Sequence, residues 1–241
     1  MNMLSITIPI ISEKLVLLGD SISKGIVLNE TNGKYERSSS SFAEILQEKG
    51  KIQLLNLSKF GATIRKGMEQ LERKRKSMPQ EGIVVLEFGG NDCNFDWSQV
   101  AEDPDYNHLS MVPLPDFVPL YEQLIGKIKE IGLRPVLLNL PPLDPRAFFE
   151  QVTQGLNKEN ILKFLGGSVD RIYRWQEMYS NTIPTLAQKC ECLFVDIRQR
   201  FLNEKHYEDY ICRDGMHPNE KGQQLIADSI LERLQELLGH R

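Results

Sequence analysis

The chain has 241 residues, of which 41% are hydrophobic and 26% charged, and its formal net charge is −4 at pH 7. This composition is that of an ordinary globular protein, long enough for one α/β domain. The slightly acidic balance argues against a general electrostatic affinity for nucleic acid or for anionic membranes. No apolar run approaches the roughly eighteen residues that a membrane span requires, so we expect no stable membrane insertion.

The N-terminal segment, residues 1–11, is apolar but has no basic start, and Pro9 interrupts it. It therefore lacks the features of a signal peptide, and we predict a cytoplasmic location. The four cysteines fit that compartment as reduced thiols. None of them forms a C-x-x-C pair, which argues against a structural zinc site, and we predict neither a metal nor a cofactor.

Short apolar runs alternate with helical patterns along the whole chain, and such alternation is typical of right-handed βαβ units. In chain order the patterns predict a strand at 14–18, a helix from 41 to about 50, a strand at 52–57, a helix from 63, a strand at 83–88, a helix from 116 to about 132, a strand at 135–140, a helix at 169–188, a strand at 193–197 and a helix at 219–238. We therefore expect an α/β protein, a single-domain three-layer α/β/α sandwich over residues 1–241 with about five parallel strands.

Local signals mark two predicted helix starts and one predicted kink. Ser41 and Glu44 have the spacing of a capping box, which opens the first helix. Asp116 is expected to cap the helix that follows the third strand. Pro184 should kink the long helix at 169–188, because proline removes a backbone donor and clashes with the preceding turn.

Three stretches show no regular pattern. Residues 23–40 are predicted to be a polar loop, and loop insertions are predicted at about 93–115 and 143–167. The first insertion is polar and broken by prolines, whereas the second is rich in Phe and Leu. Because loops of this length in compact domains commonly bind substrates, we predict that Phe95, Trp97 and His108 contribute to substrate binding.

Polar or glycine-bearing clusters fall at or beyond the ends of four predicted strands. The carboxyl ends of parallel strands meet at one edge of the sheet, so residues far apart in sequence can converge there. The clusters contain Ser21 after the first strand, Gly61 after the second, Asn91 after the third, and Asp214 with His217 beyond the fifth.

Together these residue types are suited to acyl transfer. A serine hydroxyl becomes an effective nucleophile when a neighbouring base takes its proton, and the neutral imidazole of His217 can be that base. Asp214 could orient this imidazole and stabilise its charged form. The backbone N–H groups of Ser21 and Gly61, with the side-chain amide of Asn91, could form an oxyanion hole.

Four short motifs in this order resemble the sequence blocks of the SGNH, or GDSL-type, hydrolase superfamily. They are Gly19-Asp20-Ser21, the glycine that ends 56–61, Gly89-Gly90-Asn91-Asp92, and the D-x-x-H spacing of 214–217. Each motif alone is weak, but their order and approximate spacing agree from residue 14 to about residue 238. The resemblance implies the flavodoxin-like fold of that superfamily and the catalytic roles described above, and we place Asp20 among the substrate-binding residues.

We predict a serine hydrolase that cleaves a small-molecule carboxylic ester through an acyl-enzyme. The superfamily includes lipases, thioesterases and carbohydrate deacetylases, so a thioesterase or a carbohydrate O-deacetylase stays an alternative. A small-acyl esterase is slightly preferred. Two non-enzymatic alternatives are an α/β binding module of flavodoxin type and an inactive relative that docks through the basic face at 65–76. The acyl group, the alcohol and the oligomeric state are left open.

Overall fold

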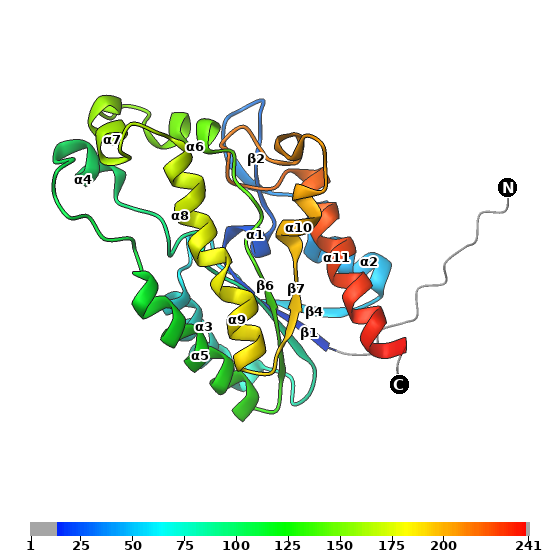
Figure 1. Ribbon diagram of the computed structural model, residues 1–241. Coiled ribbons are helices and arrows are strands. Elements are labelled where there is room, and N and C mark those ends of the chain that lie inside the picture. Colours follow the sequence, from blue (N-terminus) through cyan, green and yellow to red (C-terminus); the bar gives the residue numbers. More distant parts are fainter. Residues whose placement is uncertain (1–13, 240–241) are drawn as a thin grey trace, which may run out of the picture.

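A computed structural model describes residues 14–239 of the chain. Within this range the central element is a parallel five-stranded sheet with the strand order β4-β1-β5-β6-β7 (Figure 1). The strands are β1 (Lys14–Gly19), β4 (Gln53–Asn56), β5 (Ile83–Glu87), β6 (Arg134–Leu138) and β7 (Leu193–Val195). The predicted α/β class and its parallel sheet of about five strands are confirmed.

Helices cover both faces of the sheet and complete the three layers (Figure 1). One face carries α3 (Ile64–Lys74), α5 (Leu114–Glu130) and α9 (Thr182–Lys189), and the other carries α2 (Phe42–Gly50), α10 (Ile197–Leu202) and α11 (Glu220–Gly239). Successive residues of β1 point to opposite faces, with Val16 and Leu18 in one apolar cluster and Leu15 and Leu17 in the other. All four are buried, which explains why a continuous apolar run forms this strand.

A smaller group of helices forms a cap over the carboxyl ends of the strands. The shorter elements of the fold are α1 (Ser21–Lys24), α4 (Trp97–Glu102), α6 (Pro145–Val152), α7 (Lys158–Phe164), α8 (Asp170–Ser180) and the 3₁₀ turns η1 (Arg75–Ser77) and η2 (Tyr207–Tyr210). Helices α4, α6, α7 and α8 share an apolar cluster that includes Trp97, Phe148 and Ile161. Both insertions therefore contain helices. The prediction that 93–115 holds no regular element is wrong, because Asp96 caps α4 by accepting hydrogen bonds from the backbone N–H groups at its start.

Two of the predicted helix starts have different outcomes. The Ser41 hydroxyl accepts a hydrogen bond from the Glu44 N–H at 3.5 Å, so the cap predicted there is confirmed. The cap predicted at Asp116 is wrong, because α5 already begins at Leu114. Pro115 lies in its first turn, where a proline needs no hydrogen-bond acceptor and has a suitable φ, so the helix can start earlier. Asp116 instead forms an ion pair with Arg65 at 3.0 Å.

The long helix predicted at 169–188 is two helices that separate at Asn181. Helix α8 ends at Ser180 and α9 begins at Thr182, so Pro184 lies in the first turn of α9 and does not kink a continuous helix. A proline at 184 can neither donate to the carbonyl of Ser180 nor avoid a clash with it in a continuous helix. Because the two helices separate at Asn181, neither the missing hydrogen bond nor the clash arises.

Residues 23–40, predicted to be a loop, contain an antiparallel hairpin. Its strands are β2 (Ile26–Leu28) and β3 (Tyr35–Arg37). The dipeptide Asn32-Gly33 lies in the turn between them, and such a dipeptide is the strongest short-range signal of a hairpin. Figure 1 shows the hairpin at the same end of the molecule as α6, and its residue Tyr35 reaches the site described below.

The basic face at 65–76 lies on the exposed side of α3 and η1. Arg65 pairs with Asp116, as described above. Arg75 lies 3.9 Å from Glu72, which also accepts a hydrogen bond from Lys127 of α5 at 2.6 Å. These contacts are those of an ordinary solvated helix surface. Between residues 14 and 239, no helix is long and apolar enough to cross a membrane.

Candidate active site

Ser21 lies at the carboxyl end of the central strand β1, as the first residue of α1. The sharp change from strand to helix is made at Asp20, whose carboxylate oxygen Oδ1 accepts a hydrogen bond from the Ile22 N–H at 2.8 Å. This cap fixes the first turn of a very short helix and directs the serine hydroxyl toward the edge of the sheet. The Ser21 N–H, at the start of that helix, has no intrahelical acceptor.

A chain of hydrogen bonds connects Ser21 to two residues near the C-terminus. The distance from Ser21 Oγ to His217 Nε2 is 2.9 Å, and that from His217 Nδ1 to Asp214 Oδ2 is 2.6 Å. The three residues are 6%, 1% and 0% exposed in the order Ser21, His217, Asp214. This burial removes competing water from the chain, so each hydrogen bond is held in one geometry.

The turn that carries Asp214 and His217 is held by its own backbone. Asp214 Oδ1 accepts from the N–H groups of Met216 and His217 at 2.9 and 3.0 Å. Gly215 has φ of +74°, and a Cβ there would collide with backbone atoms of Asp144 and Phe148, so only glycine fits. Burial acts to raise the pKa of Asp214, but the His217 side chain and these backbone donors hold that pKa below its ordinary value. The carboxylate therefore stays charged at neutral pH.

Gly61 and Asn91 are the two residues besides Ser21 that the sequence predicts as oxyanion donors. Gly61 has φ of +66°, its missing side chain faces open space, and its N–H has no partner among the described residues. The Asn91 side-chain amide donates to Asp20 Oδ2 at 2.9 Å and to the Ala62 carbonyl at 3.2 Å. The amide is thus firmly positioned, but a substrate oxygen would have to replace the longer of these two hydrogen bonds.

A second buried carboxyl group, Glu87 at the end of β5, lies behind the site and was not singled out in the sequence. Its Oε2 accepts from the Ser23 hydroxyl at 3.0 Å. Burial raises the pKa of Glu87 and that of Asp20, and the Glu87 charge raises that of Asp20 further. Burial and the like charge of Glu87 thus both disfavour ionisation of Asp20. An acid in the otherwise apolar run 83–88 was the available signal.

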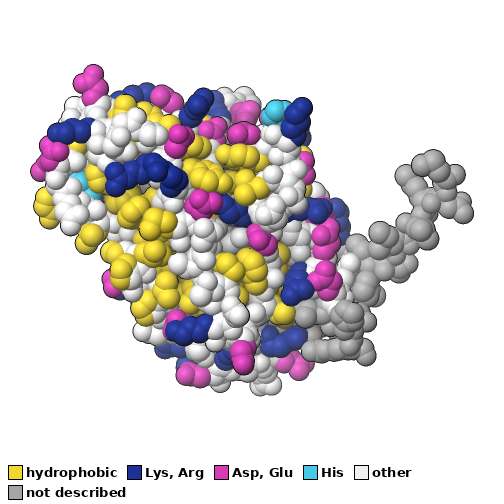
Figure 2. Space-filling view, viewed as in Figure 1, with side chains coloured by type: hydrophobic (Ala, Val, Ile, Leu, Met, Phe, Trp, Pro, Cys, Tyr) yellow, Lys and Arg dark blue, Asp and Glu magenta, His cyan; other side chains and the backbone are white. Residues whose placement is uncertain are grey.

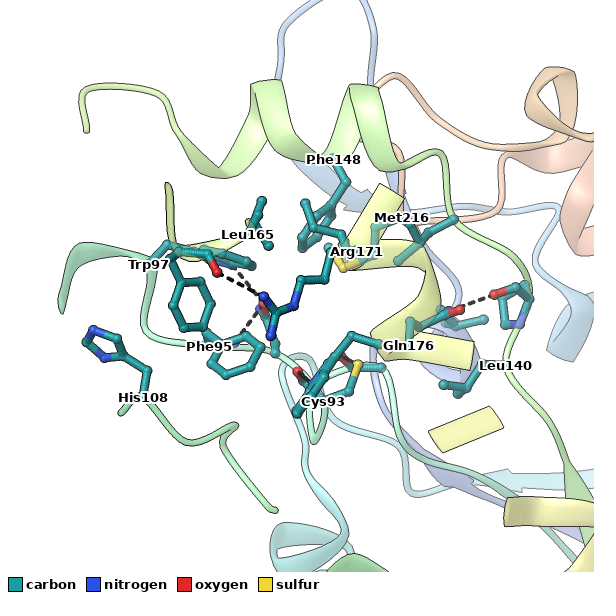
Figure 3. A pocket seen from close by; sticks show the side chains of 18 of the residues that line it. Cys93, Phe95, Trp97, His108, Leu140, Phe148, Leu165, Arg171, Gln176 and Met216 are labelled. Carbon is teal, nitrogen blue, oxygen red and sulfur yellow. Dashed lines mark hydrogen bonds between the residues drawn. The ribbon is translucent and has the colours of Figure 1, made fainter. Parts of the chain in front are cut away.

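A cavity of about 190 Å³ lies among the segments that follow the strands (Figure 3). Its lining includes Ile22 and Gly90, which directly adjoin Ser21 and Asn91 in the sequence, and it extends between the loop after β5 and the second insertion. Phe95, Trp97 and His108, the three insertion residues predicted to bind substrate, all line it. The cavity wall is mainly aromatic and aliphatic, as is usual for small-molecule sites.

The polar atoms of several cavity residues are turned to protein partners. Trp97 Nε1 donates to Asn94 Oδ1 at 2.8 Å, and Trp175 Nε1 donates to the Cys93 carbonyl at 3.0 Å. His108 Nε2 lies 2.7 Å from the Asp103 carbonyl. These side chains therefore present mostly apolar surface to the cavity.

Asp20 does not line this cavity. It is 2% exposed, and both of its carboxylate oxygens already accept hydrogen bonds from protein groups. Its position therefore suits support of Ser21 and Asn91 better than the contact with substrate predicted for it.

Two aromatic side chains, Tyr35 and Phe60, pack against the ring of His217. The Tyr35 ring centroid is 5.1 Å from that of His217, and the Phe60 ring lies 6.3 Å away and nearly parallel to it. Phe60 is 51% exposed and Tyr35 37%. Neither was singled out in the sequence, although Phe60 directly precedes Gly61 and Tyr35 follows the Asn-Gly turn.

Comparison with known proteins places this chain in a family. The chain is 25% identical over 232 residues to thioesterase 1/protease 1/lysophospholipase L1 of Escherichia coli K12. The aligned region covers 95% of this chain and 86% of that protein. The lipase/acylhydrolase of Enterococcus faecalis has a similar structure, with a TM-score of 0.64, 18% identity and coverage of 93% of this chain and 96% of the other.

A variant of an acetylxylan esterase from Geobacillus stearothermophilus has a TM-score of 0.63, 19% identity and coverage of 92% and 94%. At these identities the solved structures show a common fold, and what each relative acts on is a property of that relative. The family model described as GDSL-like lipase/acylhydrolase matches residues 17–225, which confirms the resemblance seen in the sequence motifs. The chain therefore belongs to the GDSL-like lipase/acylhydrolase family of ester-cleaving hydrolases.

Proposed function

We propose that this protein is a serine esterase that transfers the acyl group of a carboxylic ester first to Ser21 and then to water. The observation that carries the proposal is the hydrogen-bonded chain from Ser21 through His217 to Asp214. A serine and a histidine in direct contact form the nucleophile–base pair that acyl transfer requires.

In the first step, Ser21 Oγ attacks the ester carbonyl carbon while its proton passes to His217 Nε2. Asp214 stabilises the resulting imidazolium, and its lowered pKa keeps it ionised for this purpose. The carbonyl oxygen gains negative charge and accepts hydrogen bonds from the N–H groups of Ser21 and Gly61 and from the Asn91 amide. The bond to the alcohol oxygen then breaks, and that oxygen takes the proton from His217.

Water completes the cycle. His217 takes a proton from the water molecule as it attacks the acyl-enzyme carbonyl, and it returns the proton to Ser21 when the carboxylic acid leaves. Ser21, His217 and the amide donors supply the nucleophile, the base and the charge stabilisation between them. We therefore expect that a metal chelator leaves hydrolysis unchanged.

The position of His217 assigns the two halves of the substrate. The leaving alcohol must approach His217 and therefore lies near Tyr35 and Phe60, whereas the cavity beside Ile22 and Gly90 is left for the acyl group. A cavity of about 150 Å³ holds a benzene molecule, so this one has room for an acyl group larger than acetyl. The same reaction would cleave a thioester.

A carbohydrate O-deacetylase is a second candidate function, supported by the exposed rings of Tyr35 and Phe60. Their flat apolar faces are suited to the apolar face of a sugar ring on the leaving-group side. Hydrolysis of acetylated xylo-oligosaccharides in preference to 4-nitrophenyl esters of longer acids would favour this candidate over the first.

Labelling with a fluorophosphonate probe tests the proposed nucleophile. We expect one equivalent of label on wild-type protein and none on Ser21→Ala. Ser23→Ala is the matched control, because its hydroxyl is in the same short helix but donates to Glu87, and this variant should still be labelled at Ser21. Equal labelling of Ser21→Ala, or no labelling of folded wild-type protein, would contradict the proposal.

A further inference from the structure

The acyl cavity contains one charged side chain without a charged partner. Arg171, near the start of α8, lines the cavity and is exposed. Figure 3 shows its side chain extending among those of Phe95, Trp97 and Leu165. Its side chain forms one hydrogen bond among the described residues, from Nη1 to the Phe164 carbonyl at 3.3 Å.

Asp105 of the first insertion and Asp170 of α8 have partners other than Arg171. Asp105 pairs with Lys163, and Asp170 accepts from the Ser168 hydroxyl at 3.3 Å. No carboxylate within residues 14–239 forms an ion pair with Arg171. Figure 2 shows Lys and Arg side chains next to hydrophobic ones over the region where α7 and α8 meet.

Arg198, a second arginine of the same region, shows what a structural arginine looks like here. It is buried, its Nη1 donates to Gln176 Oε1 at 2.8 Å, and it lies 4.0 Å from Glu177. Its guanidinium also stacks on the Tyr173 ring. Arg171 has no comparable set of contacts, so it has most of its donors available to a ligand.

A guanidinium in a mainly apolar cavity is a specific recognition element for an anion. It stays charged at all physiological pH values and presents several N–H donors in one plane, which match the oxygens of a carboxylate. An uncharged chain would fill the cavity but leave these donors to water.

Resting on the esterase function above, we propose that Arg171 selects substrates whose acyl group ends in a carboxylate. The ester carbonyl lies at Ser21, the methylene chain fills the aromatic cavity, and the far carboxylate binds Arg171. The substrate class is thus a monoester of a dicarboxylic acid. The charge belongs to the acyl half, because the cavity begins at Ile22 and Gly90 and the leaving alcohol lies at His217.

The test compares matched substrates. One series contains mono-4-nitrophenyl esters of the dicarboxylic acids from adipic to suberic, and in the partner series an isopropyl group replaces the carboxylate. We expect wild-type protein to have the higher kcat/KM for the anionic member of at least one pair. In Arg171→Gln the ratio of anionic to neutral kcat/KM should fall roughly tenfold to a hundredfold, the range for a charge-assisted hydrogen bond, and Arg171→Lys should retain part of it.

Arg174→Gln is the matched control. Arg174 is an exposed arginine of the same helix that does not line the cavity, so its loss should leave the ratio unchanged. Equal ratios in wild type, Arg171→Gln and Arg174→Gln would overturn the inference, and so would equal losses in both arginine variants.

A third substrate places the charge on the other half. With the hexanoyl ester of 4-hydroxybenzoate, which carries its carboxylate on the alcohol, Arg171→Gln should have no specific effect. A loss confined to this substrate would overturn the assignment to the acyl half. Failure of the esterase proposal has a different result, since Ser21→Ala would then hydrolyse the neutral esters as fast as wild type.

Discussion

The floor of the site and the wall of its cavity are built in different ways. The floor consists of polar side chains that are almost wholly buried and hydrogen-bonded to one another, and it is anchored on strand ends and on the turn at 214–217. The wall consists of aromatic and aliphatic side chains from helices that cap the sheet. Catalysis therefore depends on exact hydrogen bonds in the floor, whereas the proposed choice of substrate depends on the shape of the wall and on Arg171.

Among substitutions in the floor and the wall, removal of the base His217 should lower the rate of hydrolysis most. We expect His217→Ala to lower kcat by about 10⁴-fold or more for every ester. No other group is in place to take the proton from Ser21 or to give a proton to the leaving group. Steady-state rates on short and long 4-nitrophenyl esters check this. A loss that varied strongly with acyl length would show that floor and wall are not separable.

The buried acid Asp92 should make the stability of the fold depend on pH. It is 0% exposed, accepts from the Ile64 N–H at 2.8 Å, and burial raises its pKa to about 7. In the unfolded chain it ionises near pH 4, so the unfolded state loses this proton first and the folded state loses stability as the pH rises from about 4 to 7.

Relative to Asp92→Asn, wild-type protein should therefore lose at most about 4 kcal/mol of unfolding free energy over that range and no more above it, at 1.36 kcal/mol per pKa unit. Denaturant titrations of both proteins between pH 4 and 8 measure the difference. A constant difference across that range would contradict the raised pKa.

Asn91 tests the oxyanion donors. We expect Asn91→Ala to lower kcat about a hundredfold or more with little change in KM, because one of the hydrogen bonds to the developing charge is lost. Asn94→Ala is a useful comparison, since the Asn94 side-chain oxygen accepts from Trp97 in the wall. A decrease under fivefold for Asn91→Ala would remove Asn91 from the oxyanion hole.

The smallest effect is expected from the wall. Phe95→Ala should lower kcat/KM for acyl chains that fill the cavity by roughly tenfold, through lost apolar contact, and hardly affect acetyl esters. Phe60→Ala, on the opposite side of Ser21, should instead change the dependence on the alcohol. A profile of kcat/KM against acyl length for both variants distinguishes the two, and identical profiles would refute the assignment of the two sides.

The sequence predicts the floor better than the wall, for physical reasons. Buried strands appear as continuous apolar runs, and parallel strands bring their carboxyl ends together, so the convergence of Ser21, Asn91 and His217 follows from the pattern. Local turn chemistry also supports it, as at Ser41, which caps its helix as predicted.

The wall depends on contacts between distant segments, which no local pattern specifies. Arg171 lines the cavity and Arg174 does not, and this difference is set by the packing of α8 against α4, α6 and α7. The position of Tyr35 is not evident from the sequence, because the hairpin signal at 32–33 lies within a polar stretch. Glu87 was passed over as part of an apolar strand, although a lone acid in such a run indicates a buried partner.

The most direct test of the central claim is to trap the acyl group on the protein. Wild-type protein quenched in acid during turnover of a 4-nitrophenyl ester should gain the mass of one acyl group, on the peptide that contains Ser21. Ser21→Ala should gain none. An acyl group found on another residue such as Cys93, or full turnover by Ser21→Ala, would contradict the account.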